Sequence, residues 1–107
     1  MKGPIIKSSN HRIIQSLNHQ INKMQLDILT PEHKVYSGQV YGIQLPGIEG
    51  SFEILDKHAP MIASLGKGKM KIIKDKNHTE LYEISAGFVE VLNNKATVLI
   101  EGATALD

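Results

Sequence analysis

The sequence predicts an all-β domain, an antiparallel β-sandwich or barrel, over residues 24–107. Short runs of alternating apolar and polar residues recur along this part of the chain. Turn-forming residues separate the runs about every 8–12 residues, a spacing typical of sandwiches and barrels. No stretch after residue 24 has the apolar periodicity of a helix of several turns.

The composition is that of one small domain. The chain has 107 residues, of which 41% are apolar, and this is enough for a single modest core. Since there is no Trp and there are only two Phe, we expect a core of Ile, Leu, Val and Met. The absence of Cys excludes disulfides and thiolate chemistry, which fits a reducing compartment.

Charge and hydropathy exclude further classes of protein. No apolar run approaches the roughly 20 residues needed to span a bilayer, and the N-terminus lacks the apolar stretch of a secretory signal. We therefore expect a soluble protein, or one peripheral to a membrane. Residues 1–23 carry four basic residues and no acid, whereas the remainder carries eight basic and eleven acidic residues, a net −3. Such an acidic body argues against nucleic-acid binding, which needs a basic patch.

Residues 1–23 differ from the rest of the chain. They are rich in Asn, Gln, His and Ser, and Ile13, Leu17 and Ile21 form one weak helical stripe. Because Asn and Ser are poor helix formers, we expect a disordered tail. An upstream start codon, with the true start at Met24, is a second interpretation. A transit-type presequence is a third, which the single Arg disfavours.

Alternation defines the individual strands. In the first run, Leu26 and Ile28 share one face. The second run contains Gly38 and Gly42, and a glycine inside a strand indicates a bulge or a close backbone approach. The runs predicted to be strands are residues 25–29, 35–45, 52–54, 61–63, 69–74, 80–85, 88–92 and 95–101.

Turn residues separate these runs. The end of the second run places Tyr41, Ile43 and Leu45 on one face. Asn93 and Asn94 form a two-residue hairpin turn, because Asn tolerates a positive φ. The other predicted turns are residues 30–33, 46–50, 56–58, 66–68 and 75–78.

The sequence lacks the constellations typical of catalysis or metal binding. No two of the five histidines are two or four residues apart, the usual spacing of paired ligands. The serines lack the context of a nucleophile elbow. Lys67 is followed by Gly68, whereas a phosphate-binding loop needs Ser or Thr after its Lys. We therefore predict no catalytic residue, no metal and no cofactor.

One acidic segment suits a docking surface. Glu49, Glu53 and Asp56 fall within eight residues. An acid–base pair would need carboxylates that face one cleft, and a solvated acidic loop is the favoured interpretation. Because Ile48 and Phe52 flank the acids, apolar contacts could supply affinity and the charges orientation.

Several segments, in order, resemble one known family. They are residues 26–32 (LDILTPE), 35–40 (VYSGQV), 45–55 (LPGIEGSFEIL), 58–62 (HAPMI), 84–91 (ISAGFVEV) and 96–99 (ATVL). Together they resemble the N-terminal β-sandwich of the epsilon subunit of F-type ATP synthases, called delta in mitochondria. The resemblance covers residues 24–107, and the order of the motifs is more specific than any one of them.

The resemblance implies a flattened antiparallel sandwich of about ten strands in the rotating central stalk. The partners it implies are the gamma subunit and the membrane c-ring of a proton- or cation-translocating synthase. It implies a non-catalytic subunit without a cofactor, not a homo-oligomer, at the cytoplasmic face of the bacterial inner membrane. Its role would be to couple ring rotation to ATP synthesis.

The resemblance also implies site residues by position. Thr30 falls where the family contacts gamma. Ser51 departs from the acid of some members, and Glu49 or Glu53 could supply that charge. Ala86 replaces a glycine that is common in its motif. The positions implied to face the c-ring are Glu49, Ser51, Glu53 and His58.

The end of the sequence raises a further expectation. Many members of the family continue into two antiparallel helices that can inhibit ATP hydrolysis and in some members bind ATP. This chain stops at residues 103–107, where that helical part would begin. We expect a short form without an inhibitory arm and without ATP binding. The sequence does not distinguish a natural short form from a truncated one, Met1 from Met24 as the start, or one coupling ion from another.

Two other functions remain open on sequence grounds. The first is a free-standing β-sandwich that acts as an adaptor or ligand-binding module. It would need an aromatic-lined concave site, and the chain has few aromatic residues: Tyr36, Tyr41, Phe52, Tyr82 and Phe88. The second is a small hydrolase, against which the missing catalytic constellation argues.

Overall fold

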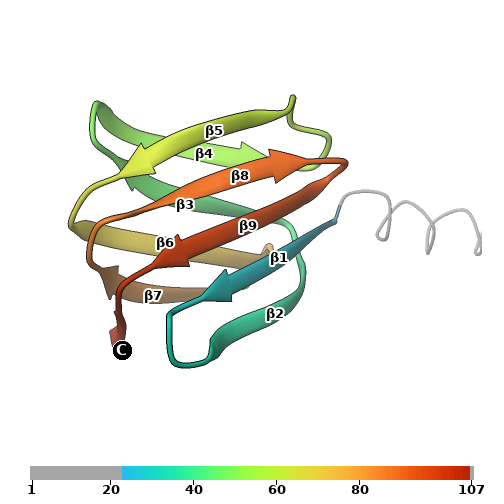
Figure 1. Ribbon diagram of the computed structural model, residues 1–107. Coiled ribbons are helices and arrows are strands. Elements are labelled where there is room, and N and C mark those ends of the chain that lie inside the picture. The colour runs from blue at the N-terminus through green and yellow to red at the C-terminus, as the bar shows by residue number, and fades with distance from the viewer. Residues whose placement is uncertain (1–22, 107) are drawn as a thin grey trace, which may run out of the picture.

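The computed structural model describes residues 23–106, and they form ten β-strands (Figure 1). The strands are β1 (Met24–Leu29), β2 (Lys34–Val40), β3 (Gly42–Gly47), β4 (Gly50–Leu55), β5 (Met61–Leu65), β6 (Gly68–Asp75), β7 (His78–Ile84), β8 (Gly87–Leu92), β9 (Lys95–Ile100) and β10 (Ala103–Leu106). The predictions for residues 1–22 lie outside the described residues. Between residues 23 and 106, no helix is long and apolar enough to cross a membrane.

The strands form one sheet that folds over on itself. Its order is β10-β7-β6-β3-β5-β8-β9-β1-β2, and β4 pairs with the other edge of β3. β3 and β5 are joined only by the pair Gly47 and Leu65, and the sheet turns there. The first layer therefore contains β4, β3, β6, β7 and β10, and the second contains β5, β8, β9, β1 and β2. Figure 1 shows the second layer in front of the first.

The core lies between the two layers. Leu26 and Ile28 of β1 are fully buried, as are Ala96 and Val98 of β9, because alternate residues of each strand point inward. No polar or charged side chain of the described residues is fully buried. The buried apolar residues are Met24, Leu26, Ile28, Val40, Ile43, Leu45, Ile54, Leu65, Met70, Ile72, Ile84, Val89, Val91, Ala96, Val98 and Ile100.

The predicted all-β sandwich of about ten strands is confirmed. All strand pairs are antiparallel except β1 and β9, which are parallel. The turn of Asn93 and Asn94 is also confirmed, with φ of 53° and 61°, the signs of a type I′ hairpin. Lys57 has a φ of 64° as well, which the sequence did not indicate.

The predicted run 35–45 is wrong as a single strand. It divides at Tyr41 into β2 and β3, which belong to different layers. Tyr41 is 39% exposed, whereas Ile43 and Leu45 are buried, so the three do not share a face. Gly42 permits the close approach expected of it, because a Cβ there would lie 3.0 Å from the carbonyl oxygen of Ile54.

β10 was not predicted from the sequence either. Residues 103–106 pair with residues 81–84 of β7. Their sequence, Ala-Thr-Ala-Leu, has little intrinsic strand preference. The edge of β7 supplies the hydrogen-bonding partners, and this long-range pairing decides the local structure.

Candidate docking site

The predicted site residues lie at two opposite ends of the sandwich. Gly47, Leu65, Gly87 and Ile100 are paired in a row across four strands, and we call this end the groove end. The turns that connect β4 to β5 and β8 to β9 lie at the other end, where the side chain of Asn94 joins them. We call it the Asn94 end.

An apolar groove lies at the groove end, on the second layer. It encloses about 530 Å³, and Phe88 on its wall is 47% exposed. The groove is lined by Leu29, Thr30, Pro31, Ala86, Gly87, Phe88, Leu99, Ile100 and Glu101. Two ladders, β1 with β9 and β8 with β9, bring these residues together, so their proximity is not visible in the sequence.

Thr30 occupies one wall of this groove. Its backbone N–H donates to the carbonyl oxygen of His33 at 2.9 Å. Its hydroxyl donates to the same oxygen at 3.1 Å and accepts from the His33 N–H at 3.3 Å. These contacts order the turn between β1 and β2, and they hold Thr30 beside the apolar wall.

The acidic turn lies at the same end, on the other layer. Glu49 and Ile48 form the tip of the hairpin between β3 and β4, and Ile48 is 68% exposed. The Ile48 N–H donates to the carbonyl oxygen of Ser64 at 3.2 Å, which ties the tip to β5. Ser51 and Glu53 are exposed on β4 and share one face, since they are two residues apart.

His58 is separated from the acidic turn. It lies beyond the far end of β4, whose six residues span about 20 Å when extended. The His58 ring Nδ1 lies 2.8 Å from the carbonyl oxygen of Ala59. Glu49, Ser51 and Glu53 therefore lie on β4 and on the hairpin that precedes it, and Thr30 lies at the same end of the sandwich. His58 lies at the Asn94 end.

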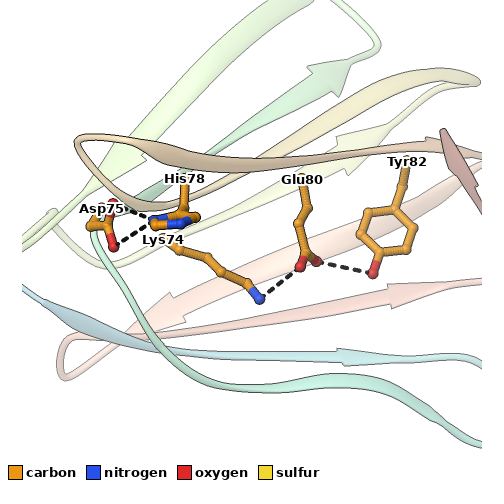
Figure 2. Close-up of polar contacts among 5 residues, drawn as sticks. All are labelled: Lys74, Asp75, His78, Glu80 and Tyr82. Carbon is orange, nitrogen blue, oxygen red and sulfur yellow. Dashed lines mark hydrogen bonds and ion pairs between the residues drawn. The ribbon is translucent and has the colours of Figure 1, made fainter. Parts of the chain in front are cut away.

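A polar cluster bridges β6 and β7 on the side of the sandwich near β2 (Figure 2). Lys74 forms an ion pair with Glu80 at 2.7 Å, and the Tyr82 hydroxyl donates to Glu80 at 3.3 Å. The hydrogen bond to Glu80 raises the pKa of Lys74, and burial raises the pKa of Tyr82. Lys74 also lies 5.4 Å from the ring centroid of Tyr36 on β2, which links the two layers.

The register of β6 shifts at this point, between Ile73 and Asp75, and such a bulge re-aims the side chain between them. Figure 2 shows Asp75 and His78 as a second pair at the hairpin turn. The hydrogen bond from the Asn77 N–H to Asp75, and then that from His78, lower the pKa of Asp75. None of these residues was singled out from the sequence, because the bulge that aligns them leaves no local signal.

A second polar network lies on the outer face of β1, β2 and β9. Asp27 accepts hydrogen bonds from Gln25 at 2.9 Å and Ser37 at 2.8 Å, and it pairs with Lys95 at 3.4 Å. The Gln25 and Ser37 hydrogen bonds lower the pKa of Asp27, and Lys95 adds to this effect. Asp27 is paired in register with Ser37 of β2 and Thr97 of β9, and this pairing makes the contacts possible. Spacing along the chain could not have indicated them.

The chemical groups on the described surface suit contact with a partner. Within residues 23–106, no group of three His, Cys, Asp or Glu side chains could hold a metal ion. The described polar clusters consist of ion pairs and hydrogen bonds on the sandwich surface. The apolar groove and the exposed acidic hairpin are the features most suited to contacting a macromolecule.

Comparison with known families decides what this sandwich is. The family model described as "ATP synthase, Delta/Epsilon chain, beta-sandwich domain" matches residues 23–105. The chain belongs to this family. The resemblance inferred from the motif order is thus confirmed over almost all of the described sandwich.

Several ATP synthase epsilon chains are similar to this chain. The ATP synthase epsilon chain of Salinibacter ruber is 40% identical over 89 residues, or 75% of this chain and 59% of that protein. The epsilon chain of Maridesulfovibrio salexigens is 44% identical over 77% of this chain and 57% of its own length. The match thus spans less than two thirds of these relatives. It spans 88% of the epsilon chain of Chlorobium limicola, at 39% identity.

Two solved structures share the fold. One comes from the "Euglena gracilis mitochondrial ATP synthase, OSCP/F1/c-ring in rotational state 1", with a TM-score of 0.75, 19% identity and coverage of 80% of this chain and 57% of that one. The other comes from the "Tetrahymena thermophila mitochondrial ATP synthase - central stalk/cring", with a TM-score of 0.63, 24% identity and coverage of 76% and 65%. At these identities the likeness establishes the fold.

Proposed function

We propose that this chain is a non-catalytic rotor subunit of an F-type ATP synthase, which docks on the gamma subunit and the c-ring. It couples rotation of the ring to ATP synthesis by holding the two together. The observation that carries the proposal is the family match over residues 23–105. Two observations support it: the relatives are ATP synthase epsilon chains, and the structural neighbours come from ATP synthase assemblies that contain the c-ring or the central stalk.

The surfaces of the sandwich suit two partners. The apolar groove beside Thr30 is our proposed gamma contact, because buried apolar and aromatic anchors supply most of the affinity of an interface. The residues proposed to face the c-ring are Glu49, Ser51, Glu53 and His58. They lie along β4 and in the turns that flank it, so one flank of the molecule carries all four.

In this arrangement the subunit is peripheral to the membrane and is held there by the other subunits of the complex. We propose the cytoplasmic face of the bacterial inner membrane, since the relatives named above are bacterial epsilon chains. It contributes no reacting group, and catalysis belongs to other subunits of the synthase.

Co-purification from solubilised membranes tests the proposal. A tagged copy of the full chain, expressed in its own host, should retain gamma and the c-ring after detergent extraction. Failure to retain gamma at micromolar concentration would favour a free-standing adaptor instead. Turnover of generic esterase or phosphatase substrates by the pure chain would favour a hydrolase.

Matched substitutions sharpen this test. We expect H58A and E49Q to weaken retention of the c-ring, whereas H78A and E83Q should not, since His78 and Glu83 lie on β7. Each pair changes the same chemical group; Glu49 and Glu83 are both exposed, whereas His58 is half-buried and His78 is exposed. Equal effects within a pair would remove His58 or Glu49 from the proposed interface.

A further inference from the structure

The Asn94 side chain connects three segments that are distant in sequence. Its Oδ1 accepts a hydrogen bond from the backbone N–H of Lys57 at 2.7 Å. Its Nδ2 donates to the Asp56 carboxylate at 2.9 Å and to the carbonyl oxygen of Lys23 at 3.2 Å. The turn between β8 and β9 is thereby joined to the turn after β4 and to the start of β1.

Only an amide fits this position. The contacts need one acceptor and two donors in a short side chain. Among small residues only Asn has an acceptor oxygen and two N–H donors, because Ser and Thr have a single donor. Asn94 also has a φ of 61°, which Asn tolerates better than most residues. Its own carbonyl oxygen accepts from the Gln25 N–H at 3.2 Å, which adds a backbone contact to the start of β1.

The turn that Asn94 contacts is a strained one. The His58 N–H donates to the carbonyl oxygen of Leu55 at 3.2 Å, which closes a four-residue turn. Lys57 is its third residue, with a φ of 64°. A turn with a positive φ at this position normally has Gly there, because a Cβ disfavours the left-handed conformation. The contact from Asn94 is made to the N–H of this same Lys57.

We propose that Asn94 is a positioning residue, which holds the turn of residues 55–58 in its left-handed conformation and so fixes where His58 is presented. That His58 faces a partner rests on the proposed function. That Asn94 orders the turn does not depend on it, because it follows from the two side-chain hydrogen bonds to Asp56 and Lys57.

Asn93 is the natural control. It occupies the same hairpin turn, with a similar φ of 53°. Its side chain makes no hydrogen bond with another residue of the part that the structure describes. N93G and N94G therefore make the same change at neighbouring left-handed positions, and only N94G removes contacts to residues 23, 56 and 57.

Amide hydrogen exchange, followed by NMR on the full chain, tests the positioning role. We expect N94G to speed the exchange of the Lys57 amide by about tenfold, the size expected when one hydrogen bond is lost. N93G should leave the Lys57 amide at the wild-type rate. N94D keeps an acceptor for this amide but sets a carboxylate against that of Asp56 and the carbonyl oxygen of Lys23, so it should not restore full protection. Equal exchange of the Lys57 amide in N94G and N93G would overturn the proposal.

Co-purification then separates the positioning role from the docking role. If the positioning acts on docking, N94G should weaken c-ring retention in the same direction as H58A, and N93G should not. If N94G speeds exchange at Lys57 while both N94G and H58A retain the c-ring fully, the positioning role stands and the proposed contact at His58 fails. If exchange at Lys57 is unchanged, the positioning role fails whatever the retention.

Discussion

The two ends of the sandwich differ in the side chains that they expose and in how these are paired. At the groove end, Leu29, Phe88 and Leu99 lie side by side on three neighbouring strands and leave an apolar groove open. At the Asn94 end, polar groups are joined to one another, and Asn94 alone makes three side-chain contacts. The apolar exceptions there are Leu55 and Leu92, with exposures of 40% and 49%, and toward the same end Ile62, with an exposure of 73%.

The outer face of the second layer changes character between these ends. Gln25, Gln39 and Lys95 are in register toward the Asn94 end, Asp27 and Ser37 occupy the middle, and Leu29 follows. Exposed apolar area offers a free-energy gain to a partner, whereas polar groups already paired offer little. The comparison therefore predicts affinity from the groove end and orientation from the Asn94 end.

The largest expected effect lies at the groove end, in G87A. A Cβ on Gly87 would collide with the carbonyl oxygen of Leu99 and lie 2.9 Å from the Cα of Ile100. Because backbone cannot yield as a side chain can, we expect a loss of about 3 kcal/mol in unfolding free energy. Urea denaturation followed by circular dichroism measures it.

The control for G87A is G66A, at the same end. The nearest atom to a Cβ on Gly66 is Ile48 Cγ2 at 3.8 Å, an ordinary contact. We expect the unfolding free energy to change by less than about 1 kcal/mol. If both variants were equally destabilised, the close approach of β8 and β9 would not be the cause.

A smaller effect, on binding, should distinguish the two ends directly. Phe88 and Leu92 lie on the same face of β8, with exposures of 47% and 49%. We expect F88A to weaken binding to the gamma subunit by about 1–2 kcal/mol, and L92A to change it little. Titration calorimetry with a gamma-containing complex measures both. An equal loss in L92A would contradict the assignment of the apolar groove to gamma.

At the Asn94 end, the strained turn gives a prediction of opposite sign. K57G should raise the unfolding free energy by about 1 kcal/mol, because Gly adopts a positive φ without steric cost. K67G is the matched change at the groove end, where Lys67 has no positive φ. It should lower the unfolding free energy by about 0.5–1 kcal/mol. Thermal denaturation compares them, and stabilisation by both variants would show that the φ of Lys57 is not strained.

The smallest expected effect concerns pH and Asp27, between the two ends. Hydrogen bonds from Gln25 and Ser37 lower its pKa below the ordinary value of 3.8. The folded state thus binds this proton less readily than the unfolded state. The contribution of Asp27 to stability is complete above about pH 5 and is lost as the pH falls through its folded pKa.

D27N removes this titrating group. The variant should be less stable than wild type at neutral pH, and its stability should fall less steeply as the solution is acidified below pH 4. Chemical denaturation at a series of pH values measures the slope. An unchanged slope would mean that the Asp27 network adds nothing to acid sensitivity.

Strand existence could be predicted well, whereas strand ends and partners could not. Leu26 and Ile28 were correctly placed on one face, which the structure buries, because alternation has a period of two, which one strand alone displays. The break at Tyr41 was missed, because it depends on β2 and β3 joining different layers. β10 was missed because residues 103–106 owe their conformation to the edge of β7.

The candidate site was likewise predicted only in part from the sequence. The motif order predicted the family, and the family model confirmed it, while the roles of Thr30, Glu49, Ser51, Glu53 and His58 stay predictions. The sequence places Glu49 and His58 nine residues apart, in two successive motifs, and the structure puts them at opposite ends of β4. The groove could not be predicted, since its walls come from strands whose pairing is long-range.

By itself the sequence determined the all-β class, the composition of the core and the two-residue turn of Asn93 and Asn94. Each of these depends on side-chain alternation or on the φ that one residue tolerates, and both are local properties. Only the tertiary structure decided the parallel pairing of β1 with β9, the apolar groove and the contacts of Asn94. These depend on where distant strands meet, because burial of the shared core fixes their register.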